Sequence, residues 1–453
     1  NLVLFLGSLV FYAWGEPVYI FLMLFSTISD YVWGRLIEEY RGKDHSRIFL
    51  LCSIGINLFI LGFFKYADFL IMTFNSVFRT SFAPLGLGLP VGISFFTFQT
   101  MSYSIDLYRR KVPVEKNYFT YLTYVSMFPQ LVAGPIVRFA TVNEELHSRK
   151  IKKEEAEKGI LRFMQGLFKK ALIANQVGAM WEEIRLLPAV QVSAATAWLG
   201  AAAFTLQLYF DFSGYSDMAI GIGKMFRLTI PENFRSPYKA ESVKDFWKRW
   251  HITLSSFLQT YVYFPLGGSR KGKARTIVNT LITFLVSGLW HGANWTFVFW
   301  GLLHGIGVAF NSLELVKVRK KWLARAFTFA YICMAFVFFR ADSLGDGFRI
   351  MGRIFSFQYN GSITALAAAM EPAEIYIVTK ALSMIAPGLV SMVQLAVMLV
   401  IAVICVAVLA QKTTQQQVER EKITPAFTFA AAFLFVWSVL SLSGVSTFVY
   451  FNF

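Results

Sequence analysis

Charged residues are scarce in this sequence, and cysteine and histidine are scarcer still. Only 15% of the 453 residues are Asp, Glu, Lys or Arg, whereas soluble domains carry about 25%. The three cysteines, Cys52, Cys333 and Cys405, lie singly in apolar stretches, so none has a neighbour at the spacing of a metal site or a redox motif. This composition excludes a large soluble enzyme, and we expect a chain without disulfides or a bound metal.

Long hydrophobic runs take up much of the chain. Residues 389–410 and 424–442 carry no charge, and each is about as long as the ~20 residues that cross a bilayer as a helix. Runs this continuous do not fit the alternating pattern of a membrane β-barrel. We therefore predict an all-α, polytopic membrane protein with about 10–11 spans and some shorter re-entrant or interfacial helices. The candidate helices are 2–14, 17–33, 48–64, 66–78, 91–105, 118–133, 160–180, 194–222, 276–290, 295–310, 321–339, 389–410 and 424–442.

The net charge of +16 is spread over short basic runs between the apolar stretches. A nucleic-acid-binding protein would gather these charges in one patch, so we expect no nucleic acid partner. Basic loops of a membrane protein face the cytoplasm. Between residues 354 and 388 the only basic residue is Lys380, so that segment is expected outside. The runs assigned to the cytoplasm are 35–47, 109–116, 138–170, 224–249, 270–275, 317–325 and 412–422.

No internal repeat or low-complexity linker divides the sequence. We expect one membrane domain over residues 1–453, a cytoplasmic basic insert at 138–170 and an extracytoplasmic aromatic tail at 443–453. The chain opens without Met and within hydrophobic sequence, so we expect a missing upstream segment, and no cleavable signal peptide is evident.

Two of the five histidines lie in SGLWHGANWTFVFWGLLHG (287–305). The stretches on either side of His291 are each about 15 residues, or about 22 Å as helix, which is short of the ~30 Å hydrocarbon core. His291 is therefore expected within the membrane, where an ionisable side chain usually has a function. A core histidine with one hydrogen bond is the alternative. His304 falls roughly 220° further around a continuous helix, and we expect a structural role for it.

Small and polar residues flank His291. Gly288 and Gly292 are four residues apart, which lets a helix or a substrate approach closely. Asn294 and Trp295 follow at the third and fourth positions after His291, on the same face if the stretch is helical.

The run KDFWKRWHITLSSFLQTYVYFPLGG (244–268) predicts an amphipathic helix at the membrane interface. Its apolar stripe holds Phe246, Trp250, Leu254, Phe257 and Tyr261, with Lys248 and Arg249 off the stripe. His251 lies at the edge of the stripe. It is either a functional group or one of the aromatic residues that gather at the membrane interface.

A cationic turn, GGSRKGKAR (267–275), follows this run and contains Arg270, Lys271 and Lys273. It could hold a phosphate-rich donor or act only as a topology determinant.

Carboxylates interrupt the apolar run that begins near residue 194. QLYFDFSGYSDMAIG (207–221) contains Asp211, Ser213, Tyr215 and Asp217. Carboxylates at membrane depth suggest function, although they can also brace a broken helix. Near Gly134–Pro135, another expected helix break, Arg138 follows at the interface.

Five ordered segments resemble hallmark segments of the bacterial membrane-bound O-acyltransferases, closest to the alginate O-acetyltransferase type, which includes peptidoglycan O-acetyltransferase relatives. They are LPVGISFFTFQTMSYSIDLYR (89–109), FPQLVAGPIVRF (128–139), QLYFDFSGYSDMAIG (207–221), FWKRWHITLSSFLQTYVYFPLGGSRKG (246–272) and SGLWHGANWTFVFWGLLHG (287–305). The resemblance covers most of residues 1–310. Residues 343–388 and 411–422 match nothing known to us.

The resemblance implies a ring of helices around a thin central core, with funnels from both faces, in a bacterial cell membrane. His291 matches the family's catalytic histidine and His251 its second hallmark position. The family moves an acyl group from a cytoplasmic donor, here acetyl-CoA, to a hydroxyl. Lys248, Arg249, Arg270, Lys271 and Lys273 would then hold the donor. A separate extracytoplasmic transferase of the SGNH type acetylates the polysaccharide.

In this chemistry His291 acts as general base, since imidazole titrates near neutrality. The oxyanion of the tetrahedral intermediate needs a hydrogen-bond donor, and either Asn294 or a protonated His251 could supply it.

The chain ends in GVSTFVYFNF (444–453), which resembles the aromatic-tyrosine motif of the membrane partner in teichoic-acid D-alanylation. Tyr450 is either an acyl carrier that folds back into the outer funnel or an interfacial anchor. Two alternative functions remain at this stage: a D-alanyl transferase to teichoic acid, and a polytopic transporter whose intramembrane His, Asp and Arg form a pathway.

Overall fold

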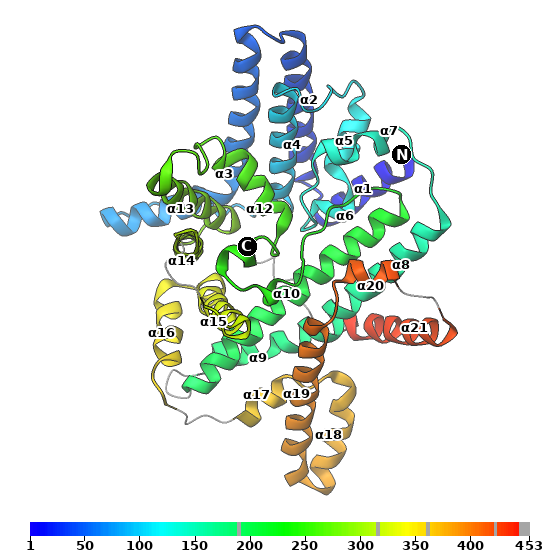
Figure 1. Cartoon of the computed structure of the whole chain (residues 1–453), viewed down its shortest axis with the longest axis vertical. Coiled ribbons are helices and arrows are strands. Elements are labelled where there is room, and N and C mark those ends of the chain that lie inside the picture. The colour runs from blue at the N-terminus through cyan, green and yellow to red at the C-terminus, as the bar shows by residue number, and fades with distance from the viewer. Residues whose placement is uncertain (188–191, 314–317, 359–362, 421–423, 444–453) are drawn as a thin grey trace. The chain divides into compact units, whose positions relative to one another are not determined.

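The structure is a computed structural model that describes residues 1–187, 192–313, 318–358, 363–420 and 424–443 (Figure 1). These residues form helices with short 3-10 and π segments and contain no strand, so the all-α prediction is confirmed. The chain divides into two compact units, and the expectation of a single membrane domain stays a prediction. One comprises residues 1–160 and 219–232, the other residues 161–218 and 233–453.

The first unit is built from the N-terminal helices. Helices α2, α3 and α4 run side by side in it. Its helices are α1 (Leu2–Gly15), α2 (Ile20–Glu39), α3 (Asp44–Phe78), α4 (Ile93–Tyr108), α5 (Tyr118–Ser126), α6 (Phe128–Leu131), α7 (Phe139–His147) and the first half of α8 (Lys153–Phe168). The last residues of α10 (Ala194–Met225) also belong to it.

Helix α3 corrects two of the expected boundaries. Residues 48–64 and 66–78, expected as separate helices, form one helix of 35 residues, about 52 Å long. Lys65, which separates the two apolar stretches, donates from Nζ to Ser94 Oγ at 3.2 Å. A single lysine with a hydrogen-bond partner does not break a helix, since only the hydrophobic pattern and not the backbone is interrupted.

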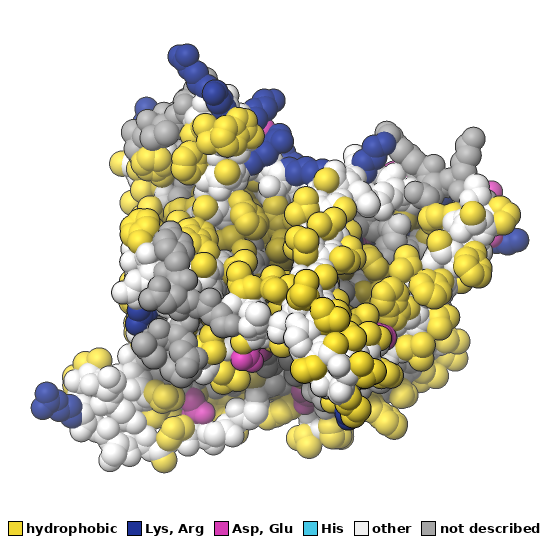
Figure 2. Space-filling view, turned by 90° about the horizontal axis from the view of Figure 1, so that it is seen from below, with side chains coloured by type: hydrophobic (Ala, Val, Ile, Leu, Met, Phe, Trp, Pro, Cys, Tyr) yellow, Lys and Arg dark blue, Asp and Glu magenta, His cyan; other side chains and the backbone are white. Residues whose placement is uncertain are grey.

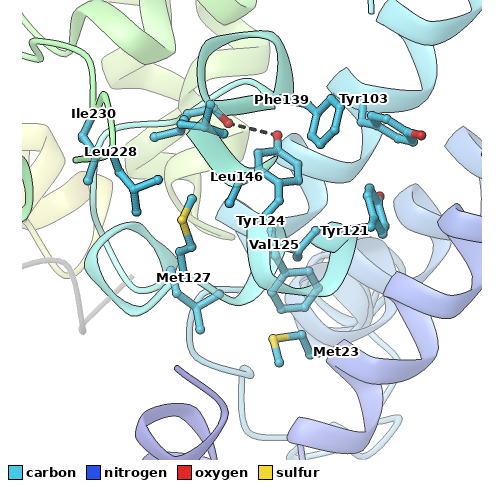
Figure 3. Packing of buried hydrophobic residues seen from close by; sticks show 14 of the residues in the cluster. Met23, Tyr103, Tyr121, Tyr124, Val125, Met127, Phe139, Leu146, Leu228 and Ile230 are labelled. Carbon is cyan, nitrogen blue, oxygen red and sulfur yellow. Dashed lines mark hydrogen bonds between the residues drawn. The ribbon is translucent and has the colours of Figure 1, made fainter. Parts of the chain in front are cut away.

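Tyrosines form much of the core of this unit. Tyr103 and Tyr124 are buried against Phe139, and Tyr121 is buried against both tyrosines. Tyr124 donates its hydroxyl to the Val137 carbonyl at 3.0 Å (Figure 3). Because a buried phenol needs a hydrogen-bond partner, this contact fixes the chain on either side of the Gly134–Pro135 turn. Arg138, one of the predicted site residues, lies in this unit as the N-cap of α7.

The second unit contains the remaining helices. Those that precede α13 are the second half of α8, the π-helix η1 (Lys169–Ala174), α9 (Asn175–Leu186), most of α10, η3 (Pro237–Lys239), α11 (Val243–Trp247), α12 (Ile252–Leu258) and the π-helix η4 (Gln259–Tyr263). Those that follow are α13 (Gly272–His291), α14 (Trp295–Ser312), α15 (Lys321–Arg340), α16 (Leu344–Ile354), α17 (Ile363–Ala369), α18 (Ala373–Ile385), α19 (Pro387–Ala410), α20 (Thr414–Arg420), α21 (Pro425–Leu440) and η5 (Ser441–Ser443).

Within the described residues, α2, α3, α15 and α19 are long and apolar enough to cross a membrane, and α1 and α21 are shorter apolar helices. This is fewer than the 10–11 spans expected. Helices α10, α13 and α14 have 32, 20 and 18 residues, but polar residues such as Asp211 in α10 and His304 in α14 lower their hydropathy. Hydrophobic side chains gather on the face shown in Figure 2, with Lys and Arg at its margins, as suits a protein in a bilayer.

Candidate functional site

A tight helical hairpin carries His291 at its tip. Helices α13 and α14 pack along their lengths because two glycines face each other. A Cβ on Gly288 would lie 2.3 Å from the Phe297 carbonyl oxygen, and one on Gly301 would lie 2.4 Å from that of Phe284. The small residues beside His291 therefore serve helix packing. The legs have 20 and 18 residues, longer than the expected 15, since the polar start of α13 is also helical.

Aromatic rings surround His291. Its ring centroid lies 4.9 Å from Trp290, 5.0 Å from Trp300 and 5.2 Å from Phe339, and the residue is 4% exposed. The ring centroid of His304 lies 4.7 Å from that of Trp300. Its Nδ1 accepts from Trp247 Nε1 at 3.1 Å, a contact that suits the structural role expected for it.

Asn294 does not share a helical face with His291. Helix α13 ends at His291, and Asn294 has an extended backbone as the N-cap of α14. Its Oδ1 accepts from Thr296 N at 3.0 Å, and its Nδ2 donates to the Asp342 carbonyl at 3.2 Å. Both polar groups of the amide are thus used in holding α14 in place.

His251 lies beside His291, with ring centroids 6.4 Å apart. The expected continuous helix over 244–268 is broken here: α11 ends at Trp247, α12 begins at Ile252, and His251 has a left-handed φ of 43°. The break directs the ring between Phe212 and Trp290, at 4.7 and 6.1 Å. Of the stripe residues of this segment, Tyr261 is half-buried and the others, Phe246, Trp250, Leu254 and Phe257, are buried.

Asn233 holds this break, and the sequence analysis did not identify it. Its carbonyl oxygen accepts from Ile252 N, and its Oδ1 accepts from Thr253 N and from Thr253 Oγ1. The same Oδ1 lies 3.1 Å from His251 Nδ1, and its Nδ2 donates to Ser216 Oγ at 3.3 Å. In the sequence Asn233 is one of several polar residues in PENFRSPY (231–238), and nothing there distinguishes it from the others.

These contacts define the tautomer of His251. A backbone N–H can only donate, so the Asn233 atom facing Thr253 N is the oxygen, and His251 Nδ1 must carry the proton. Nε2 then has the lone pair and has no hydrogen-bond partner among the described residues. His251 lies between α11 and α12, which are too short to cross a membrane. Burial lowers the pKa of His251 to about 3, so the ring is neutral near pH 7.

A cationic cavity approaches the two histidines. It has a volume of about 790 Å³, and Lys244, Lys248 and Lys273 line it without any carboxylate among its described lining residues. It reaches Ile252, the neighbour of His251, and Ser287, which precedes His291 by one helical turn, or about 6 Å. The cavity brings together residues of α11, α12, η4, α13 and the end of α14.

The predicted donor-binding residues do not all meet there. Lys248 and Lys273 line the cavity. Arg249 Nε instead donates to Asp245 Oδ1 at 2.9 Å, and Arg270 and Lys271 are exposed outside its lining. The turn that carries them is fixed to α13, because Asn279 Nδ2 donates to the Gly268 carbonyl at 2.8 Å.

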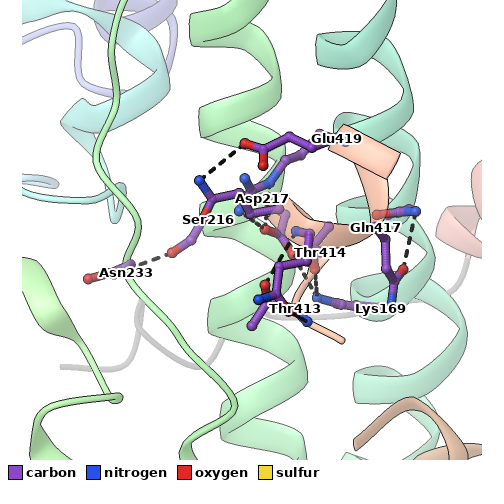
Figure 4. A network of polar contacts seen from close by, with 12 residues as sticks. Lys169, Ser216, Asp217, Asn233, Thr413, Thr414, Gln417 and Glu419 are labelled. Carbon is purple, nitrogen blue, oxygen red and sulfur yellow. Dashed lines mark hydrogen bonds and ion pairs between the residues drawn. The ribbon is translucent and has the colours of Figure 1, made fainter. Parts of the chain in front are cut away.

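The intramembrane carboxylates are paired with lysines and an arginine. Asp217 accepts from Arg162 Nη2 and Lys169 Nζ, both at 2.7 Å, and from Thr414 Oγ1 at 2.9 Å (Figure 4). Asp211 forms an ion pair with Lys170. Such contacts brace α8, η1, α10 and α20 against one another, which is the supporting role suggested as one alternative for this cluster.

These pairs bury two cations of residues 138–170, the region expected to be a cytoplasmic basic insert. Arg162 and Lys169 are 2% and 9% exposed and lie in α8 and η1, whose charges are needed inside the unit. Gly166 and Gly214 allow the close approach, since a Cβ on either would lie within 2.7 Å of the other's carbonyl oxygen. Ser213 is buried and Tyr215 half-buried on the same stretch of α10.

Two further predictions concern Tyr450 and metal binding. Tyr450 lies outside the described residues. Among the described residues, no three His, Cys, Asp or Glu side chains gather as a metal site would require.

The sequence is similar to a known family and to several known proteins. The sequence model of the membrane-bound O-acyltransferase family matches residues 109–341. A probable alginate O-acetylase AlgI of Pseudomonas putida is 41% identical over 367 residues, which are 79% of this chain and 75% of that protein. A peptidoglycan O-acetyltransferase of Helicobacter pylori is 38% identical over 389 residues, 78% of this chain and 73% of that protein. A teichoic acid D-alanyltransferase of Streptococcus thermophilus is 29% identical over 247 residues, 51% of this chain and 58% of that protein.

Proposed function

Because the chain belongs to the membrane-bound O-acyltransferase family and is thus an O-acyltransferase, we propose that it takes acetyl from acetyl-CoA on the cytoplasmic side and delivers it for O-acetylation of an extracellular or cell-wall polysaccharide. The two relatives named for acetylation of alginate and of peptidoglycan support the acetyl group and the glycan acceptor. Similarity to the D-alanyltransferase is lower and covers less of the chain, which argues against D-alanine as the group transferred. Because the chain belongs to a family of acyltransferases, we no longer consider the transporter alternative.

One observation carries this proposal: two neighbouring buried imidazoles lie close to Ile252 and Ser287, which line a cationic cavity. Three lysines line the cavity, which suits the phosphate groups of coenzyme A. Its inner end lies about one helical turn from His291, so a donor bound by its phosphates would extend its thioester toward the histidines.

In the proposed reaction His291 acts as the general base. It takes the proton of the acceptor hydroxyl as the oxygen attacks the thioester carbonyl. The carbon–oxygen bond forms, the carbon–sulfur bond breaks, and the thiolate leaves and takes up the proton. A base of this kind contributes typically ~10²–10⁴-fold to the rate.

The tautomer of His251 argues for a role as acceptor. Its Nδ1–H is donated to Asn233, so Nε2 has no proton to offer an oxyanion. Asn294, the other candidate for that role, uses its amide at the start of α14. We therefore propose that His251 Nε2 accepts a hydrogen bond or a proton from a group between the two rings. In this arrangement Asn233 orients the ring of His251, as a third residue orients the base in other acyl-transfer enzymes.

The test is transfer from radiolabelled acetyl-CoA by the full chain reconstituted in vesicles. His291→Ala should lower the rate by at least ~10²-fold while the protein remains folded in the membrane. His304→Gln, which removes another fully buried imidazole of the same unit and keeps an acceptor for Trp247, is the matched control and should retain most activity. Unchanged transfer by His291→Ala would contradict the assignment.

For the tail we propose that Tyr450 accepts acetyl and passes it to an extracytoplasmic SGNH-type transferase, which requires the C-terminus to lie outside. A phenol, with a reference pKa of about 10, loses its proton more readily than a sugar alcohol. Tyr450→Phe should then abolish acetylation of the external polysaccharide while donor binding is kept. Polysaccharide acetylation equal to wild type, measured by mass spectrometry, would reduce Tyr450 to an anchor.

A further inference from the structure

A second cavity lies in the same unit and shares no lining residue with the cationic cavity of the proposed donor site. It has a volume of about 650 Å³ and is lined by parts of α8, η1, α10, α15, α19, α20 and α21. Much of its lining, including residues 402–417, falls outside residues 109–341, which match the family.

Lysines and neutral donors line one end of this cavity. Lys169, Lys239 and Lys412 contribute there, and no Asp or Glu is among its described lining residues, but Lys169 is already paired with Asp217 at 2.7 Å. Lys239 Nζ donates to the carbonyls of Ala410 and Gln411 at 3.0 and 2.9 Å, which places its charge at the C-terminal end of α19. Lys412 is exposed. The remaining polar lining residues are Gln165, Ser236, Gln411, Thr413, Thr414 and Gln417.

The other end is apolar and follows α19. Ala402, Val406 and Leu409 line it together with Phe329 of α15 and Leu434 of α21. From Ala402 to Leu409 the cavity follows the helix for about 10 Å, and polar residues begin at Gln411. Helix α19 is long and apolar enough to cross a membrane, and 11% of its most apolar stretch is buried within the protein. The apolar end therefore faces the acyl chains of the bilayer.

The order of these groups matches that of a phospholipid. A phosphate needs cationic and hydroxyl partners, and an acyl chain needs an apolar wall that continues from them. A small soluble anion would leave the apolar wall unused, and a lipid without net charge would make no use of the charge of Lys412. Residues 412–422 are expected at the cytoplasmic face, where anionic lipids attract basic segments.

We propose that this cavity binds one anionic phospholipid, with its headgroup phosphate at Lys412 and Lys239 and one acyl chain along α19. The lipid would join α19 and α21 to α10 and α15 next to the contact between Thr414 and Asp217 (Figure 4). The proposal does not depend on the acetyltransferase function, because it concerns a different cavity.

The experiment uses the purified full chain, stripped of lipid in detergent, with phosphatidylglycerol, phosphatidylcholine or inorganic phosphate added. Phosphatidylglycerol should be retained in native mass spectrometry and raise the thermal unfolding temperature more than phosphatidylcholine does. Lys412→Gln should weaken phosphatidylglycerol binding by about five-fold, the effect of one lysine near an anionic headgroup. Lys320→Gln, an exposed lysine away from the cavity, is the control and should bind as wild type.

A second pair of variants tests the apolar end without changing charge. Ala402→Phe should fill the groove and weaken retention of phosphatidylglycerol. Ala396→Phe, exposed on the same helix outside the cavity, should not. Equal retention of both lipids, or a stabilisation by inorganic phosphate equal to that by phosphatidylglycerol, would overturn the proposal. So would wild-type binding by both Lys412→Gln and Ala402→Phe.

Discussion

Asn233 determines which nitrogen of His251 can act. A histidine in a helix was predicted from the spacing of its apolar neighbours, but the structure places it in a left-handed turn that Asn233 holds from 18 residues upstream. Neither the turn nor the tautomer follows from the local pattern, since both depend on a hydrogen bond between distant segments. The resemblance indicated the two histidines but not the residue that orients one of them.

This orientation gives a prediction at the scale of one atom. In Asn233→Asp a carboxylate replaces the amide beside Nδ1–H, and an opposite charge raises a histidine pKa by about one to three units. From about 3, the pKa would rise to about 4–6. In the proposed reaction His251 has to be neutral, and in this variant it becomes protonated as the pH falls. The ratio of variant to wild-type kcat should therefore decrease between about pH 7 and pH 5.

Thr253→Val is the control for that prediction, because it removes a hydroxyl contact to Asn233 and adds no charge. Its ratio to wild type should stay constant over the same pH range. A constant ratio for Asn233→Asp as well would show that the protonation state of His251 does not matter for transfer.

Helix boundaries were harder to predict than the helices themselves. The apolar stretches of the sequence correspond to helices in the structure, yet α3 continues through Lys65, and α13 extends to Gly272 through the basic residues Lys273 and Arg275. Hydropathy reports where a helix is apolar, whereas the backbone can continue through polar residues that find partners or water. The hairpin of α13 and α14 is therefore longer than expected.

The glycine contact of this hairpin gives a prediction at the scale of the element. Gly301→Ala places a methyl group 2.4 Å from the Phe284 carbonyl oxygen, and a backbone atom cannot rotate away as a side chain can. We expect a loss of about 1–3 kcal/mol in unfolding free energy, the usual cost of overpacking, measured by thermal or denaturant unfolding in detergent.

Gly352→Ala in α16 is its matched control, since nothing lies within 4 Å of the added methyl group. Alanine is the better helix former, so this variant should be as stable as wild type or slightly more stable. If Gly301→Ala is equally stable, the close approach of α13 and α14 is not needed.

At the scale of the molecule, the low charge content and the long apolar runs predicted the membrane class, and the family assignment and the apolar helices confirm it. The two compact units were not foreseen, because α8 and α10 each pass from one unit to the other and no linker marks the boundary. The buried bases of the second unit, such as Lys169, also reduce the number of positive charges left to determine orientation.

The orientation itself is open to a direct measurement. In a background without the three native cysteines, Lys412→Cys should react with a membrane-impermeant maleimide only in inverted vesicles, because residues 412–422 are expected in the cytoplasm. Lys380→Cys should react only in right-side-out vesicles. Labelling of both positions from the same side would refute the proposed topology and, with it, an external Tyr450.

The aromatic rings around His291 have a consequence for the length of the group that is transferred. Trp290, Trp300 and Phe339 leave His291 4% exposed, so a fatty chain would have to displace these rings further than a two-carbon unit would. Selection against long-chain thioesters would then reside in the packing of two tryptophans and a phenylalanine, while the lysines of the cavity would treat all coenzyme A derivatives alike.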